Sequence, residues 1–69
     1  MRTFIFDLIG GYYYRRGTGE PLSQYIPETF ARVTMSGFFR CMRIADGTQE
    51  YYLRKDPRTD VLELKVYKL

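Results

Sequence analysis

The alternation of apolar and polar residues is clearest from Phe38 to Leu69, where short alternating runs are separated by two turn signatures. The first signature, Asp46-Gly47-Thr48-Gln49, contains a glycine that can take positive φ without a Cβ penalty. The second, Asp56-Pro57-Arg58-Thr59, places proline where its fixed φ suits a β-turn. This part of the chain is therefore predicted to form a meander of three antiparallel strands.

Four-residue loops at both turns pair Ala45 with Glu50 and Lys55 with Asp60. Cross-strand partners share a face, so the two registers can be compared, and they agree. A slip of one residue would put charged side chains into the apolar face, which makes the choice of faces firm. The predicted inner face holds Met42, Ile44, Tyr51, Leu53, Leu62, Leu64 and Val66, and the outer face holds Arg43, Ala45, Glu50, Tyr52, Arg54, Glu63, Lys65 and Tyr67.

A further strand is predicted over Thr3 to Ile9, which is rich in β-branched and aromatic residues. Its alternation places Phe4, Phe6 and Leu8 on one face. Gly10-Gly11 follows, and two interpretations stay open: a tight hairpin, or one long strand bent by a glycine bulge. The hairpin is favoured, since a two-residue glycine loop between β-prone runs is a turn signal.

The segment from Glu20 to Phe30 is the one region that suggests a helix. Pro21 suits a first helical position, and Pro27 should end the helix near Tyr25, because the residue before a proline avoids the α region. A single extra helical turn over Pro27 to Phe30 stays open. The apolar face of this helix would consist of Leu22, Tyr25 and Ile26.

Arg32 to Ser36 alternates as a strand does, and Gly37 is interpreted as a bulge leading into the meander. The predicted fold class is α+β: an antiparallel sheet of four or five strands, with the C-terminal three-stranded meander and one short helix packed on one face. Val33 and Met35 would complete the core together with Phe4 and Phe6. Residues 1–69 are expected to form a single domain.

Composition narrows the class of protein. A hydrophobic content of 45% argues against disorder, because there is ample apolar surface to bury. The single cysteine, Cys41, excludes an internal disulfide and suits a reducing compartment, where it is expected to be a half-buried structural residue. Asp7 interrupts the apolar N-terminal run, and no long apolar stretch exists. These features predict a cytoplasmic location and no membrane association.

An enzyme is difficult to build from this set of residues. The chain has no histidine, which removes the usual general base near neutral pH and most zinc sites. Its eight carboxylates are dispersed, and no spacing among them indicates acid/base chemistry. A non-enzymatic role without cofactor or metal is therefore expected.

The most unusual local feature is the run Tyr12, Tyr13, Tyr14, Arg15 and Arg16. Tyrosine and arginine dominate protein-binding hot spots, and they also stack on bases and contact phosphates. A purely structural interpretation stays open as well, because tyrosine favours strands and arginine protects sheet edges.

The outer face of the meander offers a second candidate surface. The predicted register places Arg43, Tyr52 and Glu63 in a row, flanked by Arg54. A solvated face with complementary charges explains this row adequately, but its exposed tyrosines would also suit docking. The candidate partner-binding residues are Tyr12, Tyr13, Tyr14, Arg15, Arg16, Arg43, Tyr52 and Arg54.

In size and composition, with the Tyr12–Arg16 run and further tyrosines at Tyr51, Tyr52 and Tyr67, the chain resembles small phage-encoded inhibitors of bacterial defence, including anti-CRISPR proteins. The resemblance implies a protein that blocks a larger host protein or ribonucleoprotein complex, as a monomer or homodimer. The net charge of +3 argues against mimicry of DNA and favours docking on an acidic or mixed protein surface, or on nucleic acid. Alternatives are a small nucleic-acid-binding module and an oligomer-forming accessory protein.

Overall fold

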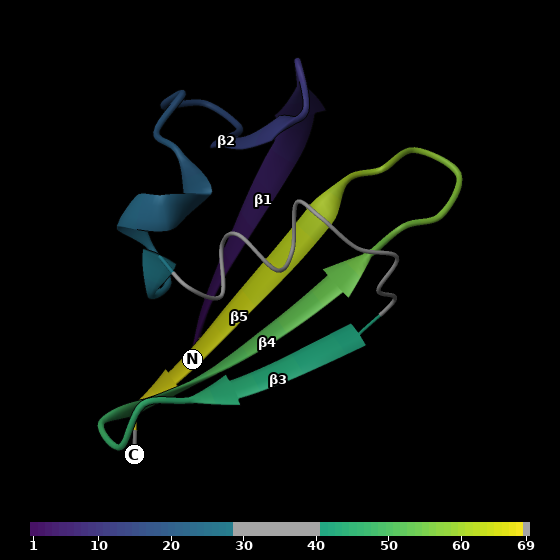
Figure 1. Ribbon diagram of the computed structural model, residues 1–69. Helices are drawn as coiled ribbons and strands as arrows, with labels where there is room; N and C mark the ends of the chain where they lie inside the picture. Colours follow the sequence, from purple (N-terminus) through teal and green to yellow (C-terminus); the bar gives the residue numbers. More distant parts are fainter. Residues whose placement is uncertain (29–40, 69) are drawn as a thin grey trace.

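The computed structural model describes residues 1–28 and 41–68, which form one twisted antiparallel sheet (Figure 1). The C-terminal strand lies in the middle of this sheet, between the N-terminal strand and the rest of the meander. The sheet order is β2-β1-β5-β4-β3. The elements are β1 (Arg2–Ile9), β2 (Tyr12–Arg15), the 3-10 turn η1 (Leu22–Gln24), β3 (Cys41–Ala45), β4 (Gln49–Lys55) and β5 (Leu62–Lys68).

The prediction of an α+β fold is wrong: the described residues are mostly β, and their one helical element is η1. Of the predicted helix over Glu20 to Phe30, the described residues form this turn and a helical Glu28, with residues 29 and 30 outside the described part. The first helical turn is costly to nucleate, and prolines at 21 and 27 leave little room to extend it. The predicted apolar side chains nevertheless pack as expected, because Leu22 and Ile26 are buried and Tyr25 lies against them.

The Gly10-Gly11 hairpin is confirmed. Both glycines have positive φ, 60° and 87°, as a two-residue type I′ turn requires. This turn places Ile9 opposite Tyr12 and Phe6 opposite Arg15.

The meander is confirmed in its strands, but only one of its two registers is correct. The first hairpin pairs Ala45 with Glu50 as predicted. In the second, Lys55 pairs with Leu62 instead of Asp60, a shift of two residues. The Asp60 N–H donates to the Asp56 carbonyl at 2.8 Å, and Asp60 has a φ of 58°, so the loop is wider than a four-residue turn.

A two-residue shift preserves the side-chain period of a strand, so the predicted faces are correct. The predicted strand over Arg32 to Ser36, the bulge at Gly37 and the core residues Val33 and Met35 lie outside the described residues. The buried core consists of Phe4, Phe6, Tyr13, Leu22, Ile26, Ile44, Tyr51, Leu53, Leu62 and Leu64, with Met42 and Val66 packed against it.

Candidate functional site

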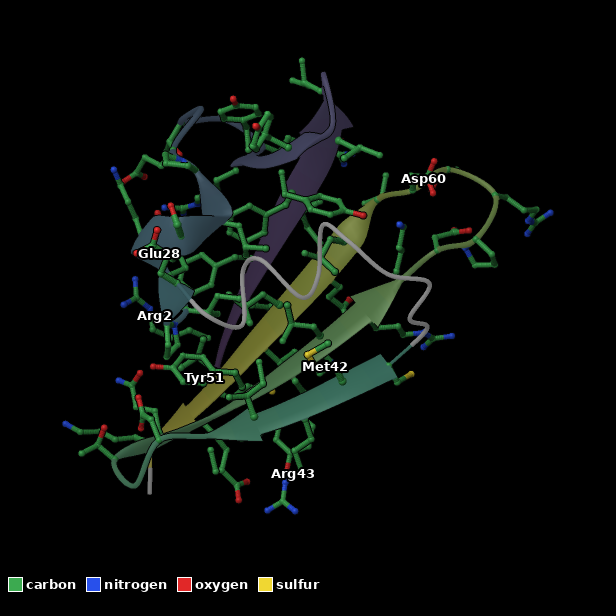
Figure 2. The ribbon with its side chains drawn as sticks, in the orientation of Figure 1. Arg2, Glu28, Met42, Arg43, Tyr51 and Asp60 are labelled. Atoms are coloured by element: carbon green, nitrogen blue, oxygen red, sulfur yellow. The ribbon has the colours of Figure 1, made fainter. Side chains whose placement is uncertain are left out.

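The two faces of the sheet differ in what covers them. The segment from 17 to 28 packs on the inner face, because Leu22 and Ile26 belong to the core beneath it (Figure 1). No described segment packs over the outer face. Figure 2 shows the consequence at β3, where Met42 and Arg43 point to opposite sides of the strand. The outer face is therefore the larger open surface in the described part of the chain.

One part of this face, here called the meander patch, consists of Arg43, Glu50, Tyr52, Lys65 and Tyr67. The register brings Arg43, Tyr52 and Lys65 into one row, so the predicted row with Glu63 is corrected by the two-residue shift. Arg43 donates to the Glu50 carboxylate, and the Tyr52 hydroxyl donates to the same group at 2.8 Å. The rings of Tyr52 and Tyr67 meet edge to face, with centroids 5.0 Å apart.

These contacts change the acidity of the groups involved. Hydrogen bonds from Arg43 and then Tyr52 lower the pKa of Glu50, and the hydrogen bond to Glu50 raises the pKa of Arg43. Glu50 accepts a hydrogen bond from the Tyr52 hydroxyl. This bond stabilises the protonated form of Tyr52, so the pKa of Tyr52 is raised. The meander patch therefore keeps a fixed pattern of charge and hydrogen bonding near neutral pH.

The second part of the face, the hairpin patch, consists of Asp7, Ile9, Tyr12, Tyr14 and Arg16. Ile9 and Tyr12 are opposite each other at the tip and are 61% and 57% exposed. Arg16 donates two hydrogen bonds to Asp7, at 2.7 and 3.1 Å, which lowers the pKa of Asp7 and raises that of Arg16. The tip is thus apolar and exposed, and a fixed ion pair lies next to it.

The structure divides the Tyr12–Arg16 run between the two faces. Tyr12 and Tyr14 belong to the outer face, whereas Tyr13 is only 2% exposed and Arg15 is opposite buried Phe6. The alternation of Phe4, Phe6 and Leu8 together with the two-residue hairpin already contains this information, because cross-strand partners share a face.

Arg15 attaches the segment after β2 to the sheet. Its Nη1 donates to the Tyr25 hydroxyl at 2.8 Å and lies 3.6 Å from a Glu20 carboxylate oxygen. Its guanidinium carbon lies 4.8 Å from the centre of the Phe4 ring. The Tyr25 hydroxyl in turn donates to Glu20 at 2.7 Å, and this hydrogen bond is the main reason that the pKa of Glu20 is lowered. Tyr13 is therefore part of the core, and Arg15 holds Tyr25 and Glu20 against the inner face of the sheet.

Arg54, the remaining candidate, is exposed and contributes to the walls of two concavities on the outer face. One, of about 470 Å³, lies over the meander patch. The other, here called the loop concavity, has a volume of about 440 Å³ and lies where the β4–β5 loop meets β1. The loop concavity is lined by Ile5, Arg54, Lys55, Asp56, Pro57, Arg58, Val61 and Glu63.

Cys41 is exposed and lies opposite Arg54, so the prediction of a half-buried structural cysteine is wrong. The cause is its position on β3, the edge strand, on the outer face. Among residues 1–28 and 41–68, no group of three or more cysteine and carboxylate side chains is arranged to hold a metal ion. Nor does this part of the chain contain a helix that is long and apolar enough to cross a membrane.

Comparison of the chain with protein-family models, curated proteins and solved structures finds no match.

Proposed function

We propose that this chain is a small non-enzymatic interaction protein that binds a larger protein through the outer face of its sheet. The observation that supports the proposal is that the face combines exposed Tyr12, Ile9 and Tyr52 with cations held by their own ion pairs. Tyrosine and arginine are the residue types that most often dominate protein interfaces.

Internal ion pairs also favour docking energetically. Fixing a long side chain at an interface costs about 0.5–1.5 kcal/mol in lost rotamer freedom. Arg43 and Arg16 are already held by Glu50 and Asp7, so part of this ordering has occurred before a partner arrives. A face prepared in this way suits recognition of one defined surface.

The alternative of a nucleic-acid-binding module has less support. Asp7, Glu50 and Glu63 lie on the same outer face as the tyrosines, and carboxylates repel a phosphate backbone. The Tyr52 ring already packs edge to face with the Tyr67 ring. The guanidinium carbon of Arg43 lies 5.9 Å from the centre of the Tyr52 ring. These neighbours restrict the ring faces on which bases would stack.

The finer proposal is that the bound protein is part of a bacterial defence complex, which the chain blocks in the cytoplasm. This step rests on the resemblance to small phage-encoded inhibitors in size, tyrosine and arginine content. The chain would act there as a monomer or homodimer, and inhibition would follow from covering a site on the larger complex.

The test is capture of partners from bacterial lysate on immobilised protein, followed by mass spectrometry. The double variant Tyr12→Ala/Tyr52→Ala should lose the captured protein, whereas Gln24→Ala, at an exposed position of η1, should retain it. Retention by the double variant, or no protein above background, would contradict the proposal. Addition of the wild-type chain to the purified captured complex should abolish its activity, and unchanged activity would refute the inhibitor role.

A further inference from the structure

In the described residues the negatively charged side chains all have interaction partners, whereas some of the positively charged side chains have no ion pair. All eight carboxylates of the chain are in the described part, and each has an interaction partner. Besides Glu28, the interactions are Asp7 with Arg16, Glu20 with Arg15 and Tyr25, Asp46 with its own turn, Glu50 with Arg43, Asp56 with the Arg58 N–H, Asp60 with Lys55, and Glu63 with Lys65.

By contrast, Arg54 and Arg58 have side chains that form no ion pair with any residue in 1–28 or 41–68. Both line the loop concavity, whereas the concavity over the meander patch is lined by Arg54 alone of the two, so the loop concavity brings both of these cations to one hollow in the surface. The carboxylates at its edge are already engaged, because Asp56 accepts a hydrogen bond from the Arg58 backbone at 2.8 Å and Glu63 lies 3.7 Å from Lys65.

We propose that the loop concavity receives an acidic side chain of the partner protein, an aspartate or glutamate whose carboxylate binds between Arg54 and Arg58. A guanidinium matches a carboxylate in planar, two-point hydrogen bonding. Ile5, Pro57 and Val61 line the same hollow and offer apolar contact to the residue beside the acidic one. This inference rests on the proposed function and names the chemistry of the partner at one end of the outer face.

A carboxylate on a peptide fits the site better than a nucleic-acid strand does. Two cations satisfy a single carboxylate, whereas a nucleic-acid strand needs a row of cations along its phosphates. Asp56 and Glu63 also line the concavity, where they would repel neighbouring phosphates. The net charge of +3 attracts either kind of acidic partner over a longer range, so the preference for a peptide carboxylate rests on the two carboxylates at the edge of the concavity.

The experiment is an NMR titration of the ¹⁵N-labelled chain with a capped Glu-Leu-Glu-Leu peptide. Saturable shifts are expected at the Nε–H groups of Arg54 and Arg58 and at the backbone of Ile5 and Val61. Arg54→Gln or Arg58→Gln should each weaken binding by about fivefold, and the double variant should abolish it. Lys68→Gln removes the same charge from an exposed position outside both concavities and should leave the affinity within about twofold.

Three results would overturn the inference. One is equal weakening by Lys68→Gln, which would indicate attraction to net charge alone. Another is equal binding of a capped Gln-Leu-Gln-Leu peptide, which has no carboxylate side chain. The third is tighter binding of inorganic phosphate or of a thymidine oligonucleotide, which would mean a free-anion or nucleic-acid site.

The capture experiment separates this inference from the proposed function. If a lysate protein is retained equally by wild type and Arg54→Gln/Arg58→Gln, and is lost from Tyr12→Ala/Tyr52→Ala, the docking face is correct and the acidic contact is wrong. If the peptide binds as expected but no lysate protein is retained, the acidic site is correct and the proposed function is wrong.

Discussion

Tyr13 provides the sharpest test of how the tyrosine run is divided between the two faces. Its side chain is 2% exposed in the core, and no hydrogen-bond partner for its hydroxyl is found among the described residues. Removing a buried aromatic ring costs about 3–5 kcal/mol. A single core at this chain length supplies roughly 3–5 kcal/mol in total, so Tyr13→Ala should be largely unfolded at 25 °C.

Two matched variants separate the ring from the hydroxyl and the core from the surface. Tyr13→Phe keeps the ring and removes a buried hydroxyl that costs about 1–3 kcal/mol when unpaired, so it should be at least as stable as wild type. Tyr12→Ala changes the neighbouring exposed tyrosine and should cost less than about 1 kcal/mol.

Urea denaturation followed by circular dichroism measures all three free energies of unfolding, and thermal melting checks them, since 1 kcal/mol corresponds to about 4–8 °C here. A Tyr13→Ala protein within 1 kcal/mol of wild type would refute the placement of Tyr13 in the core. A Tyr13→Phe protein as unstable as Tyr13→Ala would refute the unpaired hydroxyl instead.

Three further predictions concern the turns and the Arg15 contacts. Gly10 has a φ of 60°, so Gly10→Val should lower the free energy of unfolding by about 1–2 kcal/mol and Gly10→Asn by clearly less, and equal losses in urea would contradict the type I′ turn. Hydrogen bonds from the backbone N–H groups of Thr48 and Gln49, then from the Thr48 and Tyr51 hydroxyls, hold the pKa of Asp46 far below its ordinary value. Its stabilising effect is therefore complete above about pH 4 and lost as the pH falls toward the lower folded-state pKa, so Asp46→Asn should be less stable at pH 7 and lose less on acidification, and parallel stability curves in urea would exclude this effect. Tyr25→Phe removes the main hydrogen bond to Glu20 and should raise the pKa of Glu20, as measured by carboxyl ¹³C NMR, whereas an unchanged titration would show that Tyr25 is not its partner.

The faces of the strands can be predicted from this sequence, whereas one register cannot. Leu53, Leu62 and Leu64 are buried as the alternation predicts, because only the parity of the pairing decides which face a side chain occupies. The register of β4 with β5 depends on the backbone of Asp60, where a non-glycine residue takes positive φ. Aspartate tolerates that conformation but does not demand it, so the sequence does not distinguish the wider loop from a four-residue turn.

The candidate site can be predicted from the sequence only in part, because it too depends on strand register. The predicted register identifies Arg43 as a surface candidate. Composition alone identifies the Tyr12–Arg16 run but does not separate Tyr12 from Tyr13 and Arg15, which lie on the inner face, and only the hairpin register combined with the alternation of Phe4, Phe6 and Leu8 does so. The loop concavity could not be foreseen, because it depends on the register that places Glu63 opposite Ile5 and Arg54. The helix prediction is wrong although the apolar spacing on which it rested is correct. The two prolines limit the segment to a 3-10 turn at Leu22–Gln24, which is too short to continue as an α-helix.

The size of the chain explains why one face of the sheet is left open in the described residues. A sheet of five short strands has two faces, and in the described residues the segment after β2 covers only one of them. Charged side chains on an exposed sheet surface oppose unspecific association with other copies of the chain. On the outer face this is achieved by paired charges at Arg16 and Arg43, while Arg54 and Arg58 stay unpaired among the described residues. Copies of the chain present unpaired positive charge to one another and repel at this end of the sheet, whereas a partner with a carboxylate there is attracted, so the same two arginines that oppose self-association favour an acidic partner.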